Sequence, residues 1–417
     1  MSIKPEHIHS DHDPKNWSRR RFLTTAGTVG LGSLLAAYGQ QATASTAPKT
    51  QADEPATVPE RPFGKTGQMV SILSLGGMFD IPNNQLLLKQ AVKWGVTYWD
   101  TANSYEGGRS EKGIGKYFAK YPEDRKKIFL VTKTGAWTTG GMTEHLETSL
   151  ERMQTDTIDL LFVHGIRNIN KMDGDIKAWG EKAKASGKLR FFGFSTHSNM
   201  ENCLLEAAKL GWIDGIMMSY NYRLMQTDQM RAAVDACSKA GIGLTAMKTQ
   251  GGGPVKTETE TELKLAGRFL EKGFTDGQAK LKAVWENQQI ASICSQMPNL
   301  TLLMSNVSAA LDKTRLSSGD MRLLRHYARE TQSDYCAGCT AICEPALAHQ
   351  VPIGDVMRCL MYSRSYGNKE QAQAVFQSMP SETRRRLAAL DYTAAESRCP
   401  QKLAIGRLVR QAVRELS

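Results

Sequence analysis

The sequence predicts a (β/α)8 barrel followed by a helical C-terminal extension. Short apolar runs alternate with amphipathic helical stretches, which is the pattern of a parallel sheet. Eight such runs lie within residues 61–325, about the length that one barrel of this kind requires. An open doubly wound sheet is the alternative. It is disfavoured because residues 75–78 (Leu-Gly-Gly-Met), after the first run, do not continue as a G-x-G-x-x-G phosphate-binding motif.

The predicted strands follow one another at regular intervals, with helical stretches such as 85–94, 144–153 and 200–210 between them. In chain order the strands are Ser71–Leu75, Thr97–Trp99, Ile128–Thr132, Ile158–Val163, Arg190–Phe194, Gly215–Met218, Ile242–Ala246 and Ala291–Cys294. In a (β/α)8 barrel the loops after the carboxyl ends of the strands carry the chemistry. Functional residues are therefore expected directly after these strands.

The composition is that of a globular protein, with 41% hydrophobic and 23% charged residues. It excludes a collagen-like chain, a coiled coil and a wholly disordered chain. The net charge is +11, but acidic residues are interspersed with basic ones and no nucleic-acid-binding motif occurs. A solvated basic surface is therefore favoured, and no nucleic acid is expected as a partner. No stretch of eighteen apolar residues occurs, which predicts no transmembrane span.

The N-terminal residues carry the features of an export signal, in the order that such a signal has. Residues 18–23 (Ser-Arg-Arg-Arg-Phe-Leu) precede a weakly apolar stretch and an A-x-A cleavage site that ends at Ala44. The paired arginines before Phe-Leu resemble a twin-arginine signal. We therefore predict a signal peptide over residues 1–44, a linker over residues 45–60, export by the twin-arginine translocation machinery and a periplasmic location. That route carries folded proteins, so we expect a cofactor that is inserted before export.

Four polar side chains end or follow three successive predicted strands: Asp100, Tyr105, Lys133 and His164. Reduction of a carbonyl by hydride leaves charge on oxygen, and Tyr105 can donate the proton that this oxygen needs. The Lys133 ammonium is expected to lower the pKa of Tyr105, with Asp100 as its ion-pair partner. His164 can orient the carbonyl. Each residue alone is more often structural, but the four in this order favour catalysis.

These residues, together with two motifs, resemble the aldo-keto reductase family. The motifs are residues 61–67 (Arg-Pro-Phe-Gly-Lys-Thr-Gly) and 109–115 (Arg-Ser-Glu-Lys-Gly-Ile-Gly), and the resemblance extends to about residue 310. It implies a reductase barrel over residues 61–325, with the four side chains as catalytic residues. It also implies hydride transfer between a nicotinamide cofactor and a small-molecule carbonyl or alcohol substrate.

The resemblance implies which residues bind NAD(P)(H): Ser195, Thr196 and Met247 at the nicotinamide end, and Met297, Asn299 and Asn306 at the adenosine end. Thr196 stands where the family usually has Asn, and Met217 where the sixth strand usually offers a glutamine. Members specific for NADP place a Lys and an Arg on the 2′-phosphate, and here Gln296 and Leu302 stand in those places. An NADP preference is therefore not predicted.

Five of the eight cysteines lie in residues 326–417, whereas the other three (Cys203, Cys237 and Cys294) are expected to be buried small apolar residues. The candidate ligands in the tail form a C-x2-C-x3-C motif and a distant Cys-Pro pair: Cys336, Cys339, Cys343 and Cys399. A Cys-Pro pair recurs in ferredoxin-type iron–sulfur ligation, and Cys359 lies in an apolar helical stretch that is typical of packing. Zinc and disulfides are the alternatives. An iron–sulfur cluster is favoured because it also explains the export signal.

Residues 334–339 and 391–396 also resemble the C-terminal extension of an iron–sulfur branch of aldo-keto reductases. This resemblance implies that a helical extension over residues 326–417 binds one [4Fe-4S] cluster, as an electron conduit or a structural element. An electron-transfer protein then becomes a candidate partner. The alternative to an enzyme is a non-catalytic or weakly catalytic binding or assembly protein on the reductase scaffold.

Overall fold

Eight parallel strands close into a barrel in a computed structural model that describes residues 56–348 and 350–417. They pair in the order β10-β3-β4-β5-β6-β7-β8-β9, so the last strand also pairs with the first. The barrel strands are β3 (Leu73–Gly76), β4 (Tyr98–Asp100), β5 (Phe129–Thr134), β6 (Ile158–Val163), β7 (Leu189–Thr196), β8 (Gly215–Ser219), β9 (Gly243–Met247) and β10 (Ser292–Gln296). The predicted (β/α)8 barrel is therefore confirmed.

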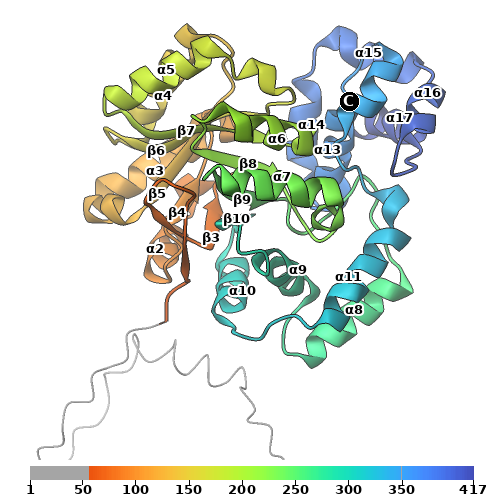
Figure 1. The fold of residues 1–417 in the computed structure, drawn as a ribbon, viewed down its shortest axis with the longest axis horizontal. Helices are drawn as coiled ribbons and strands as arrows, with labels where there is room; N and C mark the ends of the chain where they lie inside the picture. Colours follow the sequence, from red (N-terminus) through yellow and green to blue (C-terminus); the bar gives the residue numbers. More distant parts are fainter. Residues whose placement is uncertain (1–55, 349) are drawn as a thin grey trace, which may run out of the picture. The chain divides into compact units, whose positions relative to one another are not determined.

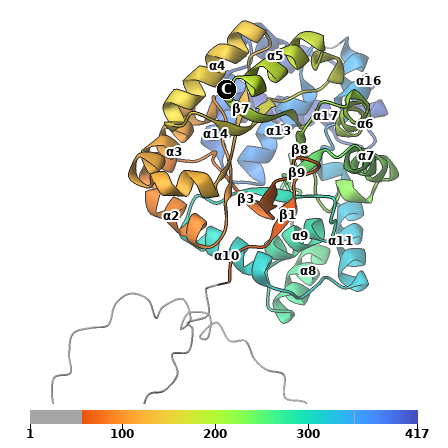
Figure 2. The same ribbon diagram turned by 60° about the vertical axis from the view of Figure 1, so that its left-hand side comes forward.

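Helices surround the barrel and connect its strands (Figures 1 and 2). Their apolar faces turn inward, and Leu88, Leu204 and Leu303 are fully buried. The helices are α2 (Gln85–Lys93), α3 (Arg109–Lys120), α4 (Thr139–Met153), α5 (Gly174–Ala185), α6 (Met200–Leu210), α7 (Asp228–Lys239), α8 (Glu260–Glu271), α9 (Asp276–Trp285) and α10 (Leu300–Leu311). Short 3-10 helices are η1 (Ile81–Asn83), η2 (Tyr105–Gly108), η3 (Pro122–Lys127), η4 (Ile169–Lys171), η5 (Leu224–Gln226), η6 (Gln332–Asp334) and η7 (Glu344–Leu347).

An antiparallel hairpin of β1 (Glu60–Pro62) and β2 (Met69–Ser71) precedes the first barrel strand. Phe63, directly after β1, is fully buried beside Gly215 and Gly243, the first residues of β8 and β9. A Cβ atom on these glycines would lie 2.8 and 2.4 Å from ring carbons of Phe63. The ring therefore fills the barrel at the amino ends of its strands, and the carboxyl ends are left for the functional site.

The chain beyond β10 is helical to its end, which confirms the predicted helical extension. Helix α11 (Ser318–Glu330) spans the domain boundary predicted at residue 325, and its Leu324 shares a core with Leu265 and Phe269 of α8. The helices after it form a hydrophobic core of their own. They are α12 (Thr340–Cys343), α13 (Ile353–Arg364), α14 (Lys369–Gln377), α15 (Ser381–Ala389), α16 (Thr393–Arg398) and α17 (Ile405–Leu416).

The extension packs on loops at the carboxyl ends of the barrel strands. After β7, the Asn199 N–H donates to the carbonyl oxygen of Gly338 at 2.8 Å, in the loop before α12. After β9, the Ser365 hydroxyl donates to the carbonyl oxygen of Gly253 at 2.7 Å. These contacts place the extension beside the end of the barrel where function is expected.

The predicted signal peptide over residues 1–44 lies outside the described residues, as does the predicted linker up to residue 55. Where the description begins, Val58 is buried and its N–H donates to the carbonyl oxygen of Trp94 at 2.9 Å. In the part of the chain that the structure describes, no helix is both long and apolar enough to cross a membrane.

Candidate active site at the barrel mouth

Four predicted catalytic side chains meet at the carboxyl ends of β4, β5 and β6. Asp100 is the last residue of β4, Lys133 lies at the end of β5, and His164 directly follows β6. Tyr105 begins η2, and its ring centroid lies 4.7 Å from Lys133 Nζ. The ring centroids of Tyr105 and His164 are 6.0 Å apart. The structure therefore brings all four predicted residues together.

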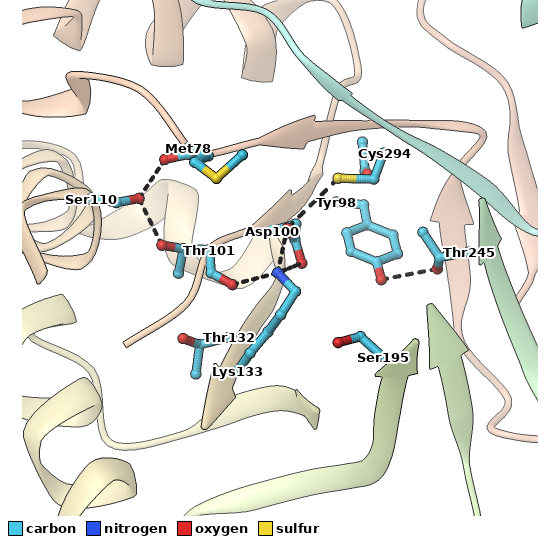
Figure 3. Close-up of polar contacts among 12 residues, drawn as sticks. Met78, Tyr98, Asp100, Thr101, Ser110, Thr132, Lys133, Ser195, Thr245 and Cys294 are labelled. Atoms are coloured by element: carbon cyan, nitrogen blue, oxygen red, sulfur yellow. Dashed lines mark hydrogen bonds and ion pairs between the residues drawn. The ribbon is translucent and has the colours of Figure 1, made fainter. Parts of the chain in front are cut away.

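The Lys133 ammonium is held by three oxygen atoms (Figure 3). Nζ donates to both carboxylate oxygens of Asp100 at 2.6 Å and to the carbonyl oxygen of Thr101 at 2.7 Å. The side chains of Lys133 and Asp100 are only 1% and 3% exposed. Because an ammonium has three N–H groups, each of them has a partner and the charge is fixed in one position.

Burial and the ion pair act in opposite directions on these two groups. Burial alone would lower the pKa of Lys133, but the neighbouring ionisable groups, chiefly the Asp100 carboxylate, outweigh it, and the pKa is raised. For Asp100, burial raises the pKa by more than Lys133 lowers it. Lys133 therefore remains an ammonium at neutral pH, beside the ring of the proposed proton donor.

Cys294 contacts the other side of the Asp100 carboxylate, as Figure 3 shows. Its Sγ, at the centre of β10, lies 3.6 Å from Asp100 Oδ2. Burial raises the pKa of Cys294, so the thiol stays protonated and can donate to the carboxylate. The expectation that Cys294 is only a small apolar residue is therefore wrong. A local pattern could not reveal this contact, because barrel closure brings β10 beside the first strands.

The loop that carries Tyr105 is anchored by a buried ion pair. Arg152 Nη1 lies 3.2 Å from Glu111 Oε2 and also donates to the carbonyl oxygen of Asn103 at 2.9 Å. Gly108 ends η2 at φ +87°, and a Cβ on it would lie 2.5 Å from the guanidinium carbon of Arg152. Glycine is therefore required where this loop passes the guanidinium.

The pKa of Tyr105 is displaced in the direction opposite to our expectation. Burial raises it by more than the Lys133 ammonium lowers it, so the pKa lies above its ordinary value. The prediction of a net lowering is wrong because the sequence indicates the neighbouring charge but not the depth of burial. The phenol is accordingly protonated at neutral pH, as a proton donor must be.

His164 is held by its backbone, whose N–H donates to the carbonyl oxygen of Thr134 at 2.9 Å. Burial, followed by the charges of Lys133, Arg358 and Lys248, lowers the pKa of His164 to about 3. The imidazole is therefore neutral near pH 7, with one nitrogen that donates and one that accepts.

Comparison with known proteins agrees with this geometry. Residues 74–303, more than half of the chain, match the aldo/keto reductase family. The chain belongs to this family. An aldo-keto reductase of Alternaria alternata is 26% identical over 230 residues, which are 44% of this chain and 62% of the relative. One of Schizosaccharomyces pombe, whose name specifies NADP(+), is 30% identical over 213 residues, which are 47% of this chain and 59% of the relative.

The chain thus matches less than two thirds of the length of these relatives. Among solved structures, an aldo-keto reductase from Bacillus halodurans in its holo form superposes with a TM-score of 0.55 at 22% identity. The superposition covers 64% of this chain and 96% of the other. Similarity at that level of identity establishes a shared fold.

Three of the predicted dinucleotide-binding residues lie at the carboxyl ends of barrel strands, as the tetrad does. Ser195 and Thr196 end β7, and Met247 ends β9. The Ser195 hydroxyl accepts from the N–H of Gly165, the residue after His164, at 3.2 Å. The Thr196 hydroxyl instead donates to the carbonyl oxygen of Ser198 at 2.8 Å. The Ser195 hydroxyl therefore keeps its own hydrogen for donation to a ligand at the mouth.

The other predicted dinucleotide-binding residues follow β10 and have partners within the protein. Met297 is fully buried. The Asn299 side chain accepts from the N–H of Leu302 at 2.9 Å and caps α10. Asn306 Nδ2 donates to the Ser295 hydroxyl at 3.0 Å. Asn299 and Asn306 thus each have one hydrogen-bond partner within the protein.

The four predicted cluster ligands line one small cavity in the extension: Cys336, Cys339, Cys343 and Cys399. Two lie in the loop before α12, one ends α12 and one follows α16. Apolar residues such as Leu403 and Ile405 complete the lining. Cys359 is fully buried in α13 and is not part of the lining.

All eight cysteines are unpaired. Burial, together with neighbouring ionisable groups, raises the pKa of Cys336 and Cys343 to about 12 and that of Cys339 to about 11. Within residues 56–348 and 350–417, no group of three or more His, Cys, Asp or Glu side chains is placed to hold a metal ion. The assignment of cluster ligands therefore stays a prediction.

Three further residues near the mouth of the barrel were not predicted from the sequence. Lys248 directly follows β9, and Arg358 and Tyr362 lie on α13. The position of Lys248 after a barrel strand was an available signal. No comparable signal exists for the residues of α13, because nothing in the sequence indicates that this helix lies beside β9.

Proposed function

We propose that this member of the aldo/keto reductase family is an exported oxidoreductase. It would transfer hydride between a nicotinamide cofactor and a carbonyl or alcohol substrate, and its extension would hold one [4Fe-4S] cluster. The observation that carries the catalytic part is the buried Lys133–Asp100 pair, with 2.6 Å contacts, next to the Tyr105 ring. Buried titratable groups with displaced pKa values cluster at functional sites.

Tyr105 is the proton donor in carbonyl reduction. Its raised pKa keeps the hydroxyl protonated at neutral pH. As negative charge develops on the carbonyl oxygen, the phenol proton moves to that oxygen. The phenolate that remains is stabilised by the Lys133 ammonium, 4.7 Å from the ring centroid. Alcohol oxidation uses the same groups in reverse.

His164 orients the substrate. Its pKa of about 3 keeps the imidazole neutral, so it does not compete with Tyr105 as the acid near pH 7. One ring N–H donates a hydrogen bond to the carbonyl oxygen and holds it in place for proton transfer.

A reduced nicotinamide supplies the hydride when it is bound. Ser195 and Thr196 would hold its amide, and Met247 would lie against its ring. Ser195 fits this role because its hydroxyl accepts from Gly165 and retains a hydrogen for the amide. Asn299 and its two companions at the adenosine end, Met297 and Asn306, would contact the rest of the dinucleotide.

The four thiols that line the small cavity would hold the cluster. Buried thiols with raised pKa values release their protons to a strong cation, and iron is such a cation. Four thiolates can hold either one [4Fe-4S] cluster or one zinc ion, and the export signal favours the cluster. When bound, a cluster supplies one-electron transfer or holds the extension together. Cys359 would be a packing residue.

The N-terminal sequence supports the export part of the proposal. The twin-arginine translocation machinery would carry the folded chain into the periplasm, with cleavage after Ala44. An electron-transfer protein that exchanges electrons with the cluster is the proposed partner. A cluster inserted in the cytoplasm would account for the use of this route by the chain.

Substitution of Tyr105 by Phe tests the catalytic proposal. We expect NADH- or NADPH-dependent reduction of 4-nitrobenzaldehyde to fall by about 100-fold or more, because only the proton donor is lost. Lys133→Met should act in the same direction. The matched control is Tyr392→Phe, since the Tyr392 hydroxyl donates only to the carbonyl oxygen of Leu387 in the extension. Wild-type turnover in Tyr105→Phe would remove this residue from the mechanism.

The side chains at the adenosine end favour one second candidate, a binding or assembly protein on the reductase scaffold. Asn299 and Asn306 already have protein partners at 2.9 and 3.0 Å. Purification followed by dinucleotide analysis separates the two functions. Stoichiometric bound dinucleotide with aldehyde turnover supports the oxidoreductase, and protein without dinucleotide or turnover supports the second candidate.

A further inference from the structure

A small crevice lies between the barrel mouth and α13. The barrel contributes His197 after β7, Ser219 at the end of β8 and Lys248 after β9. Helix α13 contributes Arg358. Cys336 belongs both to this lining and to that of the cysteine cavity, so the two spaces adjoin. The catalytic tetrad uses none of these groups.

Two cations face the crevice from opposite sides. Lys248 Nζ donates to the Tyr362 hydroxyl at 3.1 Å, and no carboxylate of the described residues forms an ion pair with it. Arg358 Nη2 lies 2.6 Å from Asp355, and Asp355 also pairs with Arg167, which in turn lies 3.9 Å from Glu344. The three cations Lys248, Arg358 and Arg167 are thus set against two carboxylates, which leaves an excess of positive charge at the crevice.

The same cations act on the two histidines nearest the crevice. Burial, then Arg358 and Lys248, holds the pKa of His197 well below its usual range. Both cations also contribute to the low pKa of His164 in the tetrad. The positive field therefore extends from the crevice to the catalytic site, and an anion bound between them would be stabilised by it.

The backbone of Lys248 adds an independent observation. Its φ of +59° is in the left-handed region, which is unfavourable for a non-glycine residue. The Asn221 side-chain amide donates to its carbonyl oxygen at 3.1 Å and helps to hold this conformation. Such strain is concentrated at ligand sites, where the surrounding structure fixes it.

We propose that this crevice binds the acidic group of the substrate, a carboxylate or a phosphate, through Lys248 and Arg358. His197 Nδ1 lies 3.2 Å from the Ser219 hydroxyl, and this hydrogen-bonded pair keeps one hydrogen for donation to the ligand. The inference rests on the proposed carbonyl reduction and extends it by naming a substrate class. The substrate is a carbonyl compound or alcohol that carries an acidic group. The acidic group enters the crevice while the carbonyl lies at Tyr105 and His164.

Matched pairs of aldehydes test this inference on the full-length protein. The carboxylate arm compares 4-carboxybenzaldehyde with its neutral methyl ester, and the phosphate arm compares glyceraldehyde 3-phosphate with glyceraldehyde. We expect kcat/KM to favour the acid by about tenfold or more in at least one arm, chiefly through KM. The arm with the larger ratio identifies the acidic group.

The substitutions Arg358→Gln and Lys248→Met should each bring the ratio of kcat/KM for the acidic aldehyde to kcat/KM for the neutral one close to one. Arg358→Lys should preserve most of the preference because the charge is retained. Arg407→Gln is the matched control, since Arg407 is exposed on α17 and its loss changes the net charge equally. Calorimetry with inorganic phosphate and with 4-carboxybenzoate measures binding without turnover, in Tyr105→Phe as well as in the wild type.

The outcomes separate the two proposals. Reduction of acid and neutral aldehydes with equal kcat/KM, unchanged by Arg358→Gln, would overturn the acidic-substrate inference and leave carbonyl reduction standing. An Arg358→Gln variant that raises KM for the dinucleotide alone would assign the crevice to the cofactor and also overturn it. Anion binding that depends on Arg358 without reduction of any aldehyde would contradict the proposed function instead.

Discussion

Lys248 Nζ lies 3.1 Å from the Tyr362 hydroxyl oxygen, and this contact joins the end of β9 to helix α13 of the extension. Nζ also lies 4.3 Å from the centroid of the same ring. Burial alone would raise the pKa of Tyr362, but Lys248 and Arg358 outweigh burial and lower it. The extension thus places a second tyrosine–lysine pair near the tetrad. The pKa of Tyr362 is lowered, whereas the pKa of Tyr105 is raised.

We predict that Tyr362 ionises below the ordinary tyrosine pKa of about 10. Alkaline titration, followed by tyrosinate absorbance, should show one early step in the wild type. Tyr362→Phe should remove that step and Lys248→Met should move it to higher pH, whereas Tyr392→Phe should leave it in place. An early step that survives in Tyr362→Phe would contradict the assignment.

The same displacement has a consequence for stability. The folded protein prefers ionised Tyr362, so this group stabilises the fold fully above the unfolded pKa of about 10. The contribution is lost as pH falls through the lowered pKa of the folded state. Urea unfolding at a series of alkaline pH values should show this contribution in the wild type and not in Tyr362→Phe.

We predict that His164 does not titrate in the pH profile of the reaction. Its folded pKa is about 3, so kcat/KM should not fall through protonation of His164 between about pH 5 and 8. Stability behaves differently, because the unfolded histidine titrates near 6.5. The contribution of neutral His164 to the free energy of unfolding is complete above about pH 6.5, and it declines as pH falls towards 3.

Urea unfolding between about pH 4 and 7 tests the predicted effect on stability. His164→Gln should reduce the slope of the free energy of unfolding against pH. Part of this slope should remain in the variant because the pKa of His197 is also lowered. A kcat/KM that falls with an apparent pKa near 6.5 in the wild type, and no longer does so in His164→Gln, would contradict a neutral, buried His164.

The barrel and the meeting of the tetrad were predictable because they depend on local patterns. Asp100 and Lys133 end apolar runs and His164 directly follows one, and each run became a strand. Closure of a parallel barrel then brings their carboxyl ends to one mouth, whatever the details of packing. Only the order of the strands was needed to bring these side chains together.

Contacts between distant segments were not predictable. Lys248 and Tyr362 are 114 residues apart, and no periodicity indicates that they touch. The predicted direction of the Tyr105 pKa shift was wrong for a related reason, because burial depends on all the segments that pack around the barrel mouth. Single-sequence patterns indicate residue types and faces, whereas these features depend on how the extension packs on the barrel.

Gly338, between Cys336 and Cys339, provides a prediction about this packing. It has φ +77°, and a Cβ on it would lie 2.3 Å from the carbonyl oxygen of His197. Gly338→Ala should therefore destabilise the protein by about 2–3 kcal/mol, which urea unfolding measures. Gly174→Ala is the control, since nothing lies within 4 Å of a Cβ added there. Equal stability of the two variants would contradict the close contact.

Export provides a prediction that does not depend on the described residues. Replacement of Arg19 and Arg20 together by Lys keeps the charge but removes the paired arginines. We expect the variant to stay in the cytoplasm with its signal uncleaved, as cell fractionation and the mass of the chain would show. Efficient export with cleavage after Ala44 would mean that the segment is not a twin-arginine signal.

The cluster proposal is tested by five single Cys→Ser variants, each purified anaerobically. Loss of one proposed ligand leaves an iron atom exposed, so iron and acid-labile sulfide should be depleted in four variants. These are the variants of the cysteines that line one cavity: Cys336, Cys339, Cys343 and Cys399. Cys359→Ser is the built-in control, because Cys359 is fully buried in α13 away from the cavity.

Cys359→Ser should cost only a packing penalty on the order of 1 kcal/mol and keep its iron. Full iron in Cys399→Ser, beside depletion in Cys359→Ser, would transfer the fourth ligand to Cys359. Stoichiometric zinc without sulfide in the wild type would overturn the iron–sulfur proposal and its redox role. The tetrad would remain unaffected by that result, because Lys133 and Cys294 each contact Asp100 inside the barrel.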